Sequence, residues 1–481
     1  MSQTTKPPPR NLKKDCLSYP EVIAQSVSVI APATVPAAVV GLVYASAGNG
    51  MWLSFLLGLI GLTIVALNVN QFARRSASPG SLYTYIVKGL GPTAGVLAGW
   101  ALLLGYVATG MSTLCGFAIF AQIIIGSIGV HLPVLLLFVI CAAVACFIAY
   151  RDIQFSAKLM LVFEILAMLV ILALGILLWK HTGFAIDTDQ FSLKGATPSG
   201  ILLGVVLVVF AFSGFESATA LGDEAKNPLQ TIPRAVRNST IIAGVYFLFM
   251  AYVVTLAFQG TGADLGQEEA PLNFLAPRIG LGFFGTLINF GALLSFFACT
   301  LACINSTARI VFSMSRHGLF HDFLGEAHHI NKTPHVAVIL TALITLLVPV
   351  GVLLFGVTAF EAQGHFGTLA SFGFLLIYLL VSLAAPFYLR KLKILRARDV
   401  FYAALAITFI ALPVLGTVGL PGSTLFPPPS YPDNLFVWVF VAYMAVGIGW
   451  LIVQRFRSPK MIHAVKASVD EIHESFEPAG K

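Results

Sequence analysis

Charge is the scarcest property of this chain. Asp, Glu, Lys and Arg make up 10% of its 481 residues, whereas they make up about 25% of a soluble protein. Hydrophobic residues make up 58%, and apolar runs long enough to span a bilayer recur along almost the whole length. The composition therefore excludes a soluble globular protein and predicts an all-α polytopic membrane protein.

Cysteine is also rare, and its placement does not suit a disulfide framework. None of the six cysteines falls in a predicted external loop, and none belongs to a CxxC motif or a Cys/His cluster. We therefore expect no metal and no cofactor. The sequence also lacks a GxSxG motif, a helical metal-binding motif and paired catalytic acids within a span, which argues against a membrane enzyme.

Twelve apolar segments are expected to cross the membrane. They cover residues 22–46, 52–72, 93–126, 132–150, 156–179, 199–221, 236–258, 281–312, 335–355, 366–388, 400–419 and 434–454. Together they form one twelve-helix domain, 22–454, between an N-terminal tail, 1–21, and a C-terminal tail, 455–481. No separate soluble domain is expected.

The basic residues predict the orientation. All but three of the 28 lie in the tails and in connections on one side of these spans, the exceptions being Lys180, Lys194 and Arg278. Because connections rich in Lys and Arg stay inside, we expect both termini in the cytoplasm and a location in the cell (inner) membrane. The net charge of +7 is then explained by topology, and nucleic-acid binding is not expected.

Two spans are interrupted near their middle, five spans apart. The first interruption is rich in proline and comprises Ala31, Pro32, Ala33, Thr34 and Val35. The second lies in the sixth span and comprises Phe210, Phe212, Ser213, Gly214 and Phe215. Since five is odd, two such repeats enter the membrane in opposite directions, which is typical of transporters with a binding site at the breaks. The alternative is an unrelated proline kink and packing glycine.

Glu216 directly follows the second break, at a depth where hydrocarbon is expected. A charged side chain there costs about 2.5–3.5 kcal/mol on insertion scales, so we predict a role in coupling, with Ser217 as a hydrogen-bond partner of the protonated carboxyl. Glu164, in the fifth span, is either a second coupling residue or a partner of a polar group on a neighbouring helix.

Four further polar residues lie within the predicted spans. Tyr106, Thr109 and Asn289 are candidates for the substrate pocket, although each of them suits an interhelical hydrogen bond equally well. Arg309 lies close to the end of the eighth span, and we expect its side chain to reach the cytoplasmic interface.

Four sequence blocks resemble the amino acid–polyamine–organocation superfamily of secondary transporters. They are PGSLYTYIVKGLGPTAGVLAGW (79–100), FSGFESATALGDEAKNPLQTIPRA (212–235), INSTARIVFSMSRHGLFHDFLGEAHHINKTPHVAV (304–338) and GTLASFGFLLIYLLVSLAAPFYLR (367–390). The resemblance implies a LeuT-like fold: two inverted five-helix repeats, here 22–180 and 199–390, plus two extra helices, 400–454. Such proteins carry amino acids, polyamines or related cations.

The resemblance also implies roles within the sixth span. Phe210 corresponds to an aromatic gate over the substrate, the Phe212–Phe215 backbone to the unwound segment that takes the substrate amine, and Glu216 to a carboxylate that handles protons or cations. The first span departs from the family pattern, because a proline-rich segment replaces the glycine- and serine-rich turn of many relatives.

The eighth span departs as well. Sodium-coupled relatives place two hydroxyl residues about eleven positions before its closing basic residue, where this chain has Ala298 and Cys299, with Thr300 next to them. We therefore expect proton coupling or substrate exchange rather than sodium coupling.

The sequence thus predicts a secondary transporter for an amino acid or related amine, working by alternating access, with the small-molecule substrate, a proton and the lipid bilayer as its partners. A polyamine or organic-cation carrier and a non-transporting permease-like receptor remain as alternatives. The substrate and the oligomeric state stay open.

Overall fold

The structure is a computed structural model, which describes residues 11–268, 270–457, 461–474 and 476. The first half of the chain contains α1 (Tyr19–Ile30), η1 (Val35–Val39), α2 (Val40–Ala47), η2 (Gly48–Gly50), α3 (Met51–Ala73), α4 (Ser81–Leu90), α5 (Pro92–Gly126), α6 (Val134–Arg151), α7 (Ile153–His181), α8 (Thr188–Phe191), α9 (Pro198–Ala211) and η3 (Ser217–Leu221).

The second half contains α10 (Pro228–Phe258), η4 (Leu265–Gln267), α11 (Pro271–Arg278), α12 (Phe283–Arg316), η5 (Asp322–Gly325), α13 (His335–Leu354), α14 (Ala359–Lys391), α15 (Ala397–Val418), α16 (Asp433–Arg457) and α17 (Met461–Glu474). The symbol η marks a 3-10 helix, except for η1, which is π-helical. Over the described ranges the only β pairing is an isolated bridge between Leu17 and Ala225, so the all-α class is confirmed.

Ten segments of the described chain are long and apolar enough to cross a membrane. One of them, Tyr19–Ala73, runs from α1 to α3 and contains two of the twelve spans expected from the sequence. The helix α9 has 14 residues, about 21 Å at 1.5 Å per residue, which is less than the hydrocarbon thickness of about 30 Å. The span expected over 199–221 includes η3 as well as α9.

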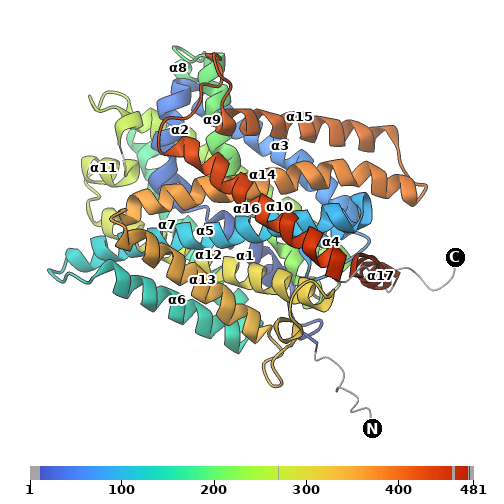
Figure 1. Cartoon of the computed structure of the whole chain (residues 1–481). Helices are drawn as coiled ribbons and strands as arrows, with labels where there is room; N and C mark the ends of the chain where they lie inside the picture. Colours follow the sequence, from blue (N-terminus) through green and yellow to red (C-terminus); the bar gives the residue numbers. More distant parts are fainter. Residues whose placement is uncertain (1–10, 269, 458–460, 475, 477–481) are drawn as a thin grey trace, which may run out of the picture.

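The helices α5, α12 and α14 form the centre of the bundle. α5 packs along both of the others, and the backbones approach closely: a Cβ on Gly373 of α14 would lie 2.6 Å from the carbonyl oxygen of Ala101 in α5. The most apolar part of α12 is 72% buried, whereas that of the segment Asn434–Phe456 is 11% buried. Figure 1 shows the corresponding helix, α16, crossing in front of α14 and α5.

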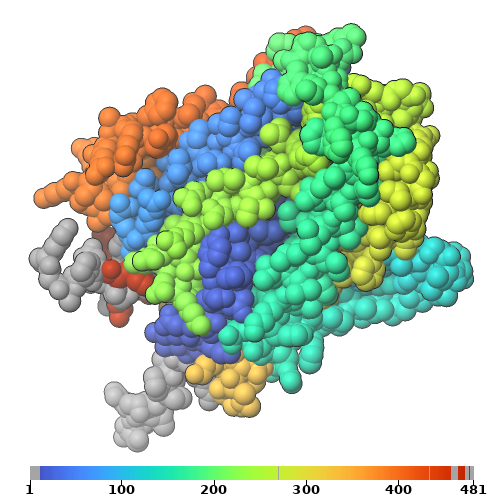
Figure 2. Space-filling model, turned by 180° about the vertical axis from the view of Figure 1, so that it is seen from behind, coloured from blue at the N-terminus to red at the C-terminus, as the bar shows by residue number. Residues whose placement is uncertain are grey.

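The helix α1 lies on the opposite face of the bundle. It packs against α7 and α10, and Figure 2 shows the blue N-terminal segment between the teal-green α7 and the lime-green α10. Since α10 follows the second break in the sequence, its contact with α1 brings the first break close to the part of the chain that follows the second break.

One end of the bundle, which we call the termini end, holds both described ends of the chain. The N–H groups of Cys16 and Leu17 donate to the Glu224 carbonyl at 2.8 and 2.9 Å, and that of Lys226 donates to the Leu17 carbonyl at 2.8 Å. α17 packs against α4, which in turn packs against η3. Residues 11–18, hereafter the N-terminal strap, are therefore fixed to the loop that follows the second break.

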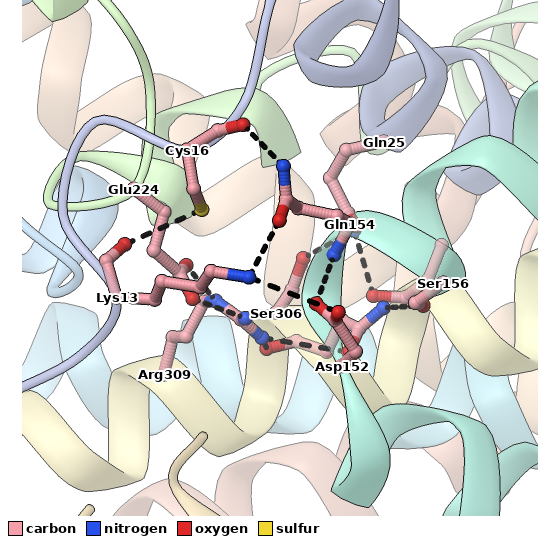
Figure 3. Close-up of polar contacts among 11 residues, drawn as sticks. Lys13, Cys16, Gln25, Asp152, Gln154, Ser156, Glu224, Ser306 and Arg309 are labelled. Carbon is pink, nitrogen blue, oxygen red and sulfur yellow. Dashed lines mark hydrogen bonds and ion pairs between the residues drawn. The ribbon is translucent and has the colours of Figure 1, made fainter. Parts of the chain in front are cut away.

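A buried ion pair lies beneath the N-terminal strap. The Arg309 side chain is 1% exposed and that of Glu224 is 0% exposed. The guanidinium donates to both carboxylate oxygens of Glu224, at 2.8 Å from Nη2 to Oε1, and also to the Asn305 carbonyl at 2.9 Å. The expectation that Arg309 reaches the interface is therefore wrong, because a carboxylate and a carbonyl satisfy its donors inside the protein. Figure 3 shows this pair beside the strap residues.

Breaking this ion pair should destabilise the protein strongly. Arg309→Met and Glu224→Gln each leave one uncompensated buried group, a change that costs about 3–5 kcal/mol when a buried partner is removed. We expect a lower thermal unfolding temperature for each purified variant in detergent, and a double variant that is less destabilised than the sum of the two. Single variants with wild-type unfolding temperatures would show that the pair does not stabilise the fold.

Candidate functional site

The first break separates α1 from α2. α1 ends at Ile30, Ala31 adopts a left-handed conformation with φ 50°, and the π-helical η1 begins at Val35. Pro32 and Pro36 lack the N–H group that a continuous α-helix requires. The Thr34 hydroxyl donates to the Ala31 carbonyl at 2.8 Å, so this turn uses the one hydroxyl that the sequence offers here.

The second break begins where α9 ends at Ala211. The backbone continues through Gly214, whose φ of 95° favours glycine, into η3. A Cβ on Gly214 would lie 2.1 Å from Cγ1 of Val29. The second break therefore packs against the last turn of α1, just before the first break, and Gly214 is required both by its backbone conformation and by the closeness of α1.

Two hydrogen bonds join η3 to α1 next to the breaks. The Ser217 hydroxyl donates to the Gln25 carbonyl at 3.1 Å, and the Ala218 N–H donates to the Ser26 hydroxyl at 3.0 Å. All four residues are buried. The Ala218 N–H thereby gains a partner that a continuous helix would have supplied from within itself, which is the condition for irregular backbone inside a membrane protein.

Glu216 is completely buried between two tyrosines. The Tyr106 hydroxyl donates to Oε1 at 2.8 Å, and the Tyr378 hydroxyl donates to Oε2 at 2.7 Å. Tyr378 also accepts from the Gly214 N–H at 3.0 Å. Tyr106 comes from α5 and Tyr378 from α14, so the carboxyl group links the second break to two of the three central helices.

One expectation about the surroundings of Glu216 needs correction, and one of its hydrogen-bond partners was not expected. Ser217 was expected to bond the carboxyl, but its hydroxyl points to α1 and donates to Gln25. Tyr378, which does bond it, was missed by the sequence analysis. The available signal was a tyrosine within the apolar run LLIYLL of the tenth span, since a tyrosine hydroxyl inside a membrane needs a partner.

Aromatic rings enclose the Glu216 cluster. The ring of Phe215 lies 5.1 Å from that of Tyr378, and the ring of Phe374 lies 5.3 Å from that of Tyr106. Phe212 points away from the cluster, with its ring 5.0 Å from that of Phe247 in α10. Apolar walls around one carboxyl group exclude water and favour a ligand group that replaces its hydrogen bonds.

Phe210 lies at the end of α9, immediately before the break, and is half-buried. Its ring packs against Gly367 of α14, where a Cβ would lie 3.1 Å from Cζ of Phe210 and 3.7 Å from the Ser112 hydroxyl oxygen of α5. The Phe210 ring therefore extends from α9 to α14 beside the second break, at a point where Ser112 of α5 is also close to α14.

The other predicted site residues have different surroundings. The Thr109 hydroxyl donates within α5 to the Gly105 carbonyl at 2.8 Å. Asn289 accepts from the Asn273 amide of α11 at 2.7 Å and lies ten residues from Cys299 on the same helix, about 15 Å along its axis. Glu164 is 1% exposed and accepts from the Ser295 hydroxyl of α12 at 3.0 and 3.1 Å.

Polar contacts continue from the breaks to the termini end. The Gln25 amide donates to the Ala302 carbonyl at 2.8 Å and to the Ser306 hydroxyl at 3.0 Å, and the Asn305 amide donates to the Ser156 hydroxyl at 2.8 Å. Figure 3 shows Gln25, Ser156 and Ser306 beside the Glu224–Arg309 pair and the strap. Because all of these side chains are buried, the protein is closed between Glu216 and the termini end.

Comparison with known proteins identifies the family of this chain. The family model described as amino acid permease matches residues 22–461. The branched-chain amino acid permease BcaP of Bacillus subtilis is 26% identical over 63% of this chain and 69% of its own length. The low-affinity putrescine importer PlaP of Escherichia coli is 28% identical over 76% and 79% of the two chains, and the methylthioribose transporter of Bacillus subtilis is 24% identical over 83% and 85%.

The family match covers the helices that carry both breaks, the two tyrosines and Glu216. It confirms the resemblance indicated by the four sequence blocks, and it excludes the enzyme class, since the relatives are permeases and transporters. This chain belongs to the amino acid permease family.

Proposed function

We propose that this protein is a secondary transporter that moves an amino acid or related amine across the membrane by alternating access. The observation that carries the proposal is the Glu216 carboxyl group, which is buried at the second break and accepts hydrogen bonds from the Tyr106 hydroxyl of α5 and the Tyr378 hydroxyl of α14. A substrate ammonium is a natural partner for such a carboxyl and for the free carbonyls of a broken helix.

The substrate would lie between the first break, 31–35, and the second break, 210–216. A broken helix offers N–H groups on one side and C=O groups on the other, so the pair of breaks suits a zwitterion. Phe210 is placed to cover the substrate, because its ring already packs against Gly367 of α14 beside the break. Tyr106 and Tyr378 would orient the Glu216 carboxyl toward the amine.

The proposed topology has twelve spans. α1 with α2 and α9 with η3 would each count as one discontinuous span, and the repeats would be 22–180 and 199–390 in inverted orientation, followed by 400–454. An even number of spans agrees with the position of both described chain ends at the termini end. The excess of basic residues there supports a cytoplasmic location for this end and insertion into the cell membrane.

Proton coupling or exchange is favoured over sodium coupling. The Cys299 thiol, where sodium-coupled relatives have a hydroxyl, donates to the Val29 carbonyl at 3.3 Å. The neighbouring Thr300 hydroxyl contacts the Phe296 carbonyl and Thr113. Hard cations take several oxygen ligands, and a thiol is a poor substitute for one of them.

A polyamine or other organic cation is the second candidate substrate. Two observations favour it: the putrescine importer among the relatives and a second buried carboxyl group, Glu164, near the central helices. Purified protein in liposomes, screened with labelled amino acids and diamines with and without a pH gradient, would distinguish the candidates. A protein that takes up neither class under any gradient would contradict the transporter proposal and favour a receptor.

Replacing Phe210 by alanine should weaken substrate retention more than folding. Loss of an aromatic face beside an amine costs about 1–2 kcal/mol, so we expect an apparent affinity about tenfold lower in the liposome assay. Phe401→Ala on α15, where the ring is 62% exposed, serves as the control and should behave as wild type. Wild-type affinity in a folded Phe210→Ala protein would show that the ring only packs the helices.

Replacing Glu216 by glutamine should separate exchange from accumulation. Glutamine imitates the protonated carboxyl, because its oxygen still accepts from one tyrosine hydroxyl while its amide group donates toward the other tyrosine oxygen. Since glutamine cannot release a proton, substrate counterflow should persist while gradient-driven uptake is lost. Glu164→Gln provides the matched comparison at the other buried carboxyl and should retain accumulation. Accumulation with unchanged pH dependence in Glu216→Gln, together with its loss in Glu164→Gln, would assign coupling to Glu164 instead.

A further inference from the structure

A basic cavity lies at the termini end, separate from the site between the breaks. It has a volume of about 550 Å³ and is lined by residues 11–14 of the strap and by His328, His329 and Lys332 of the loop that precedes α13. Three lysines and two histidines face it, and its lining includes no carboxylate. The volume is in the range of pockets that take small ligands.

The strap wall of this cavity is fixed by an apolar anchor. Leu12 is 2% exposed and packs in a small cluster with Phe312 of α12 and Ala327. The Arg316 guanidinium donates to the Asn11 side-chain oxygen at 2.9 Å. The backbone that carries Lys13 and Lys14 is therefore held in place before the lysines by Asn11 and Leu12. After the lysines it is held by the hydrogen bonds of Cys16 and Leu17 to Glu224.

The opposite wall is a closed loop of six residues. The His328 N–H donates to the Thr333 carbonyl at 2.9 Å, and the Lys332 N–H donates to the His328 carbonyl at 3.0 Å. The Thr333 hydroxyl donates to the Tyr150 carbonyl at 2.7 Å, and the Tyr150 ring lies 5.2 Å from that of His328. Nδ1 of His328 accepts from the Asn331 N–H at 3.1 Å, which leaves Nε2 as the hydrogen donor of the neutral ring.

The surrounding acids offset only part of this positive charge. The Lys13 ammonium lies 3.8 Å from the Asp152 carboxylate and also bonds Gln154. Asp223 is close enough to Lys14 to interact with it electrostatically, and Glu326 interacts in the same way with His335. Within the described ranges neither Lys14 nor Lys332 forms an ion pair. Two ammonium groups thus remain available to an anion.

We propose that this cavity binds a phosphate group, carried either by an anionic lipid headgroup or by a phosphate compound in solution. Lysine ammoniums and histidine N–H groups are charge-assisted donors for phosphate oxygens, and anionic lipids attract clustered lysines at a membrane surface. A phosphate here joins the strap to the 328–332 loop. Since the strap also bonds the Glu224 backbone, the bound anion stabilises the closed termini end.

The test compares a cavity variant with a matched control. Lys14→Gln/Lys332→Gln removes the two available charges, and Lys393→Gln/Lys466→Gln removes the same charge from exposed sites at the same end. Binding of inorganic pyrophosphate to the full-length protein in detergent is measured by calorimetry. Thermal stability is measured in phosphatidylcholine bilayers with and without phosphatidylglycerol. Both readouts are independent of which solute is transported.

Loss of two charged contacts should weaken pyrophosphate binding by about tenfold or more, while the control pair keeps wild-type affinity. Pyrophosphate binding that is weakened in the cavity variant but not in the control pair identifies a soluble phosphate compound as the ligand. Stabilisation by phosphatidylglycerol alone, lost only in the cavity variant, identifies a lipid headgroup. The proposal is overturned if the cavity variant and the wild type behave alike in both measurements, or if the control pair loses as much as the cavity variant.

Discussion

A carboxyl group removed from water needs hydrogen-bond donors from the protein, and the centre of this bundle is arranged around that need. Glu216 takes one donor from α5 and one from α14, so these helices have to approach each other and the second break at the same level. The contact of Gly373 with the α5 backbone and of Gly214 with Val29 permits this approach. Bulkier residues at either glycine would separate the groups that Glu216 requires.

The same requirement for internal partners explains why two interrupted helices are stable inside a membrane protein. The half-helices do not satisfy their own backbone groups, but α1 and η3 exchange hydrogen bonds through Gln25, Ser26, Ser217 and Ala218. The segment that carries Glu216 is therefore bonded directly to α1. At the termini end, the strap and the buried Arg309–Glu224 pair join the same segment to α12, so opening this end requires that several buried contacts separate together.

The helix α12 connects these regions because five residues that bond its neighbours lie on one face. Ser295, Cys299, Ala302, Ser306 and Arg309 follow each other at intervals of three or four residues and so lie in one row along the helix. Through this row α12 contacts Glu164, the Val29 carbonyl, Gln25 and Glu224 in order. The relatives transport different solutes, as their names state.

The sequence by itself determined the membrane class, the family and the positions of both breaks, because hydropathy, proline placement and glycine act locally along the chain. Glu216 could also be identified, since a lone carboxylate in an apolar segment is conspicuous without any structure. Its second partner, Tyr378, lies 162 residues away, and the partner of Arg309 lies 85 residues away. Only the tertiary structure decided these pairings, because a buried polar group bonds whichever donor the packing of distant helices places beside it.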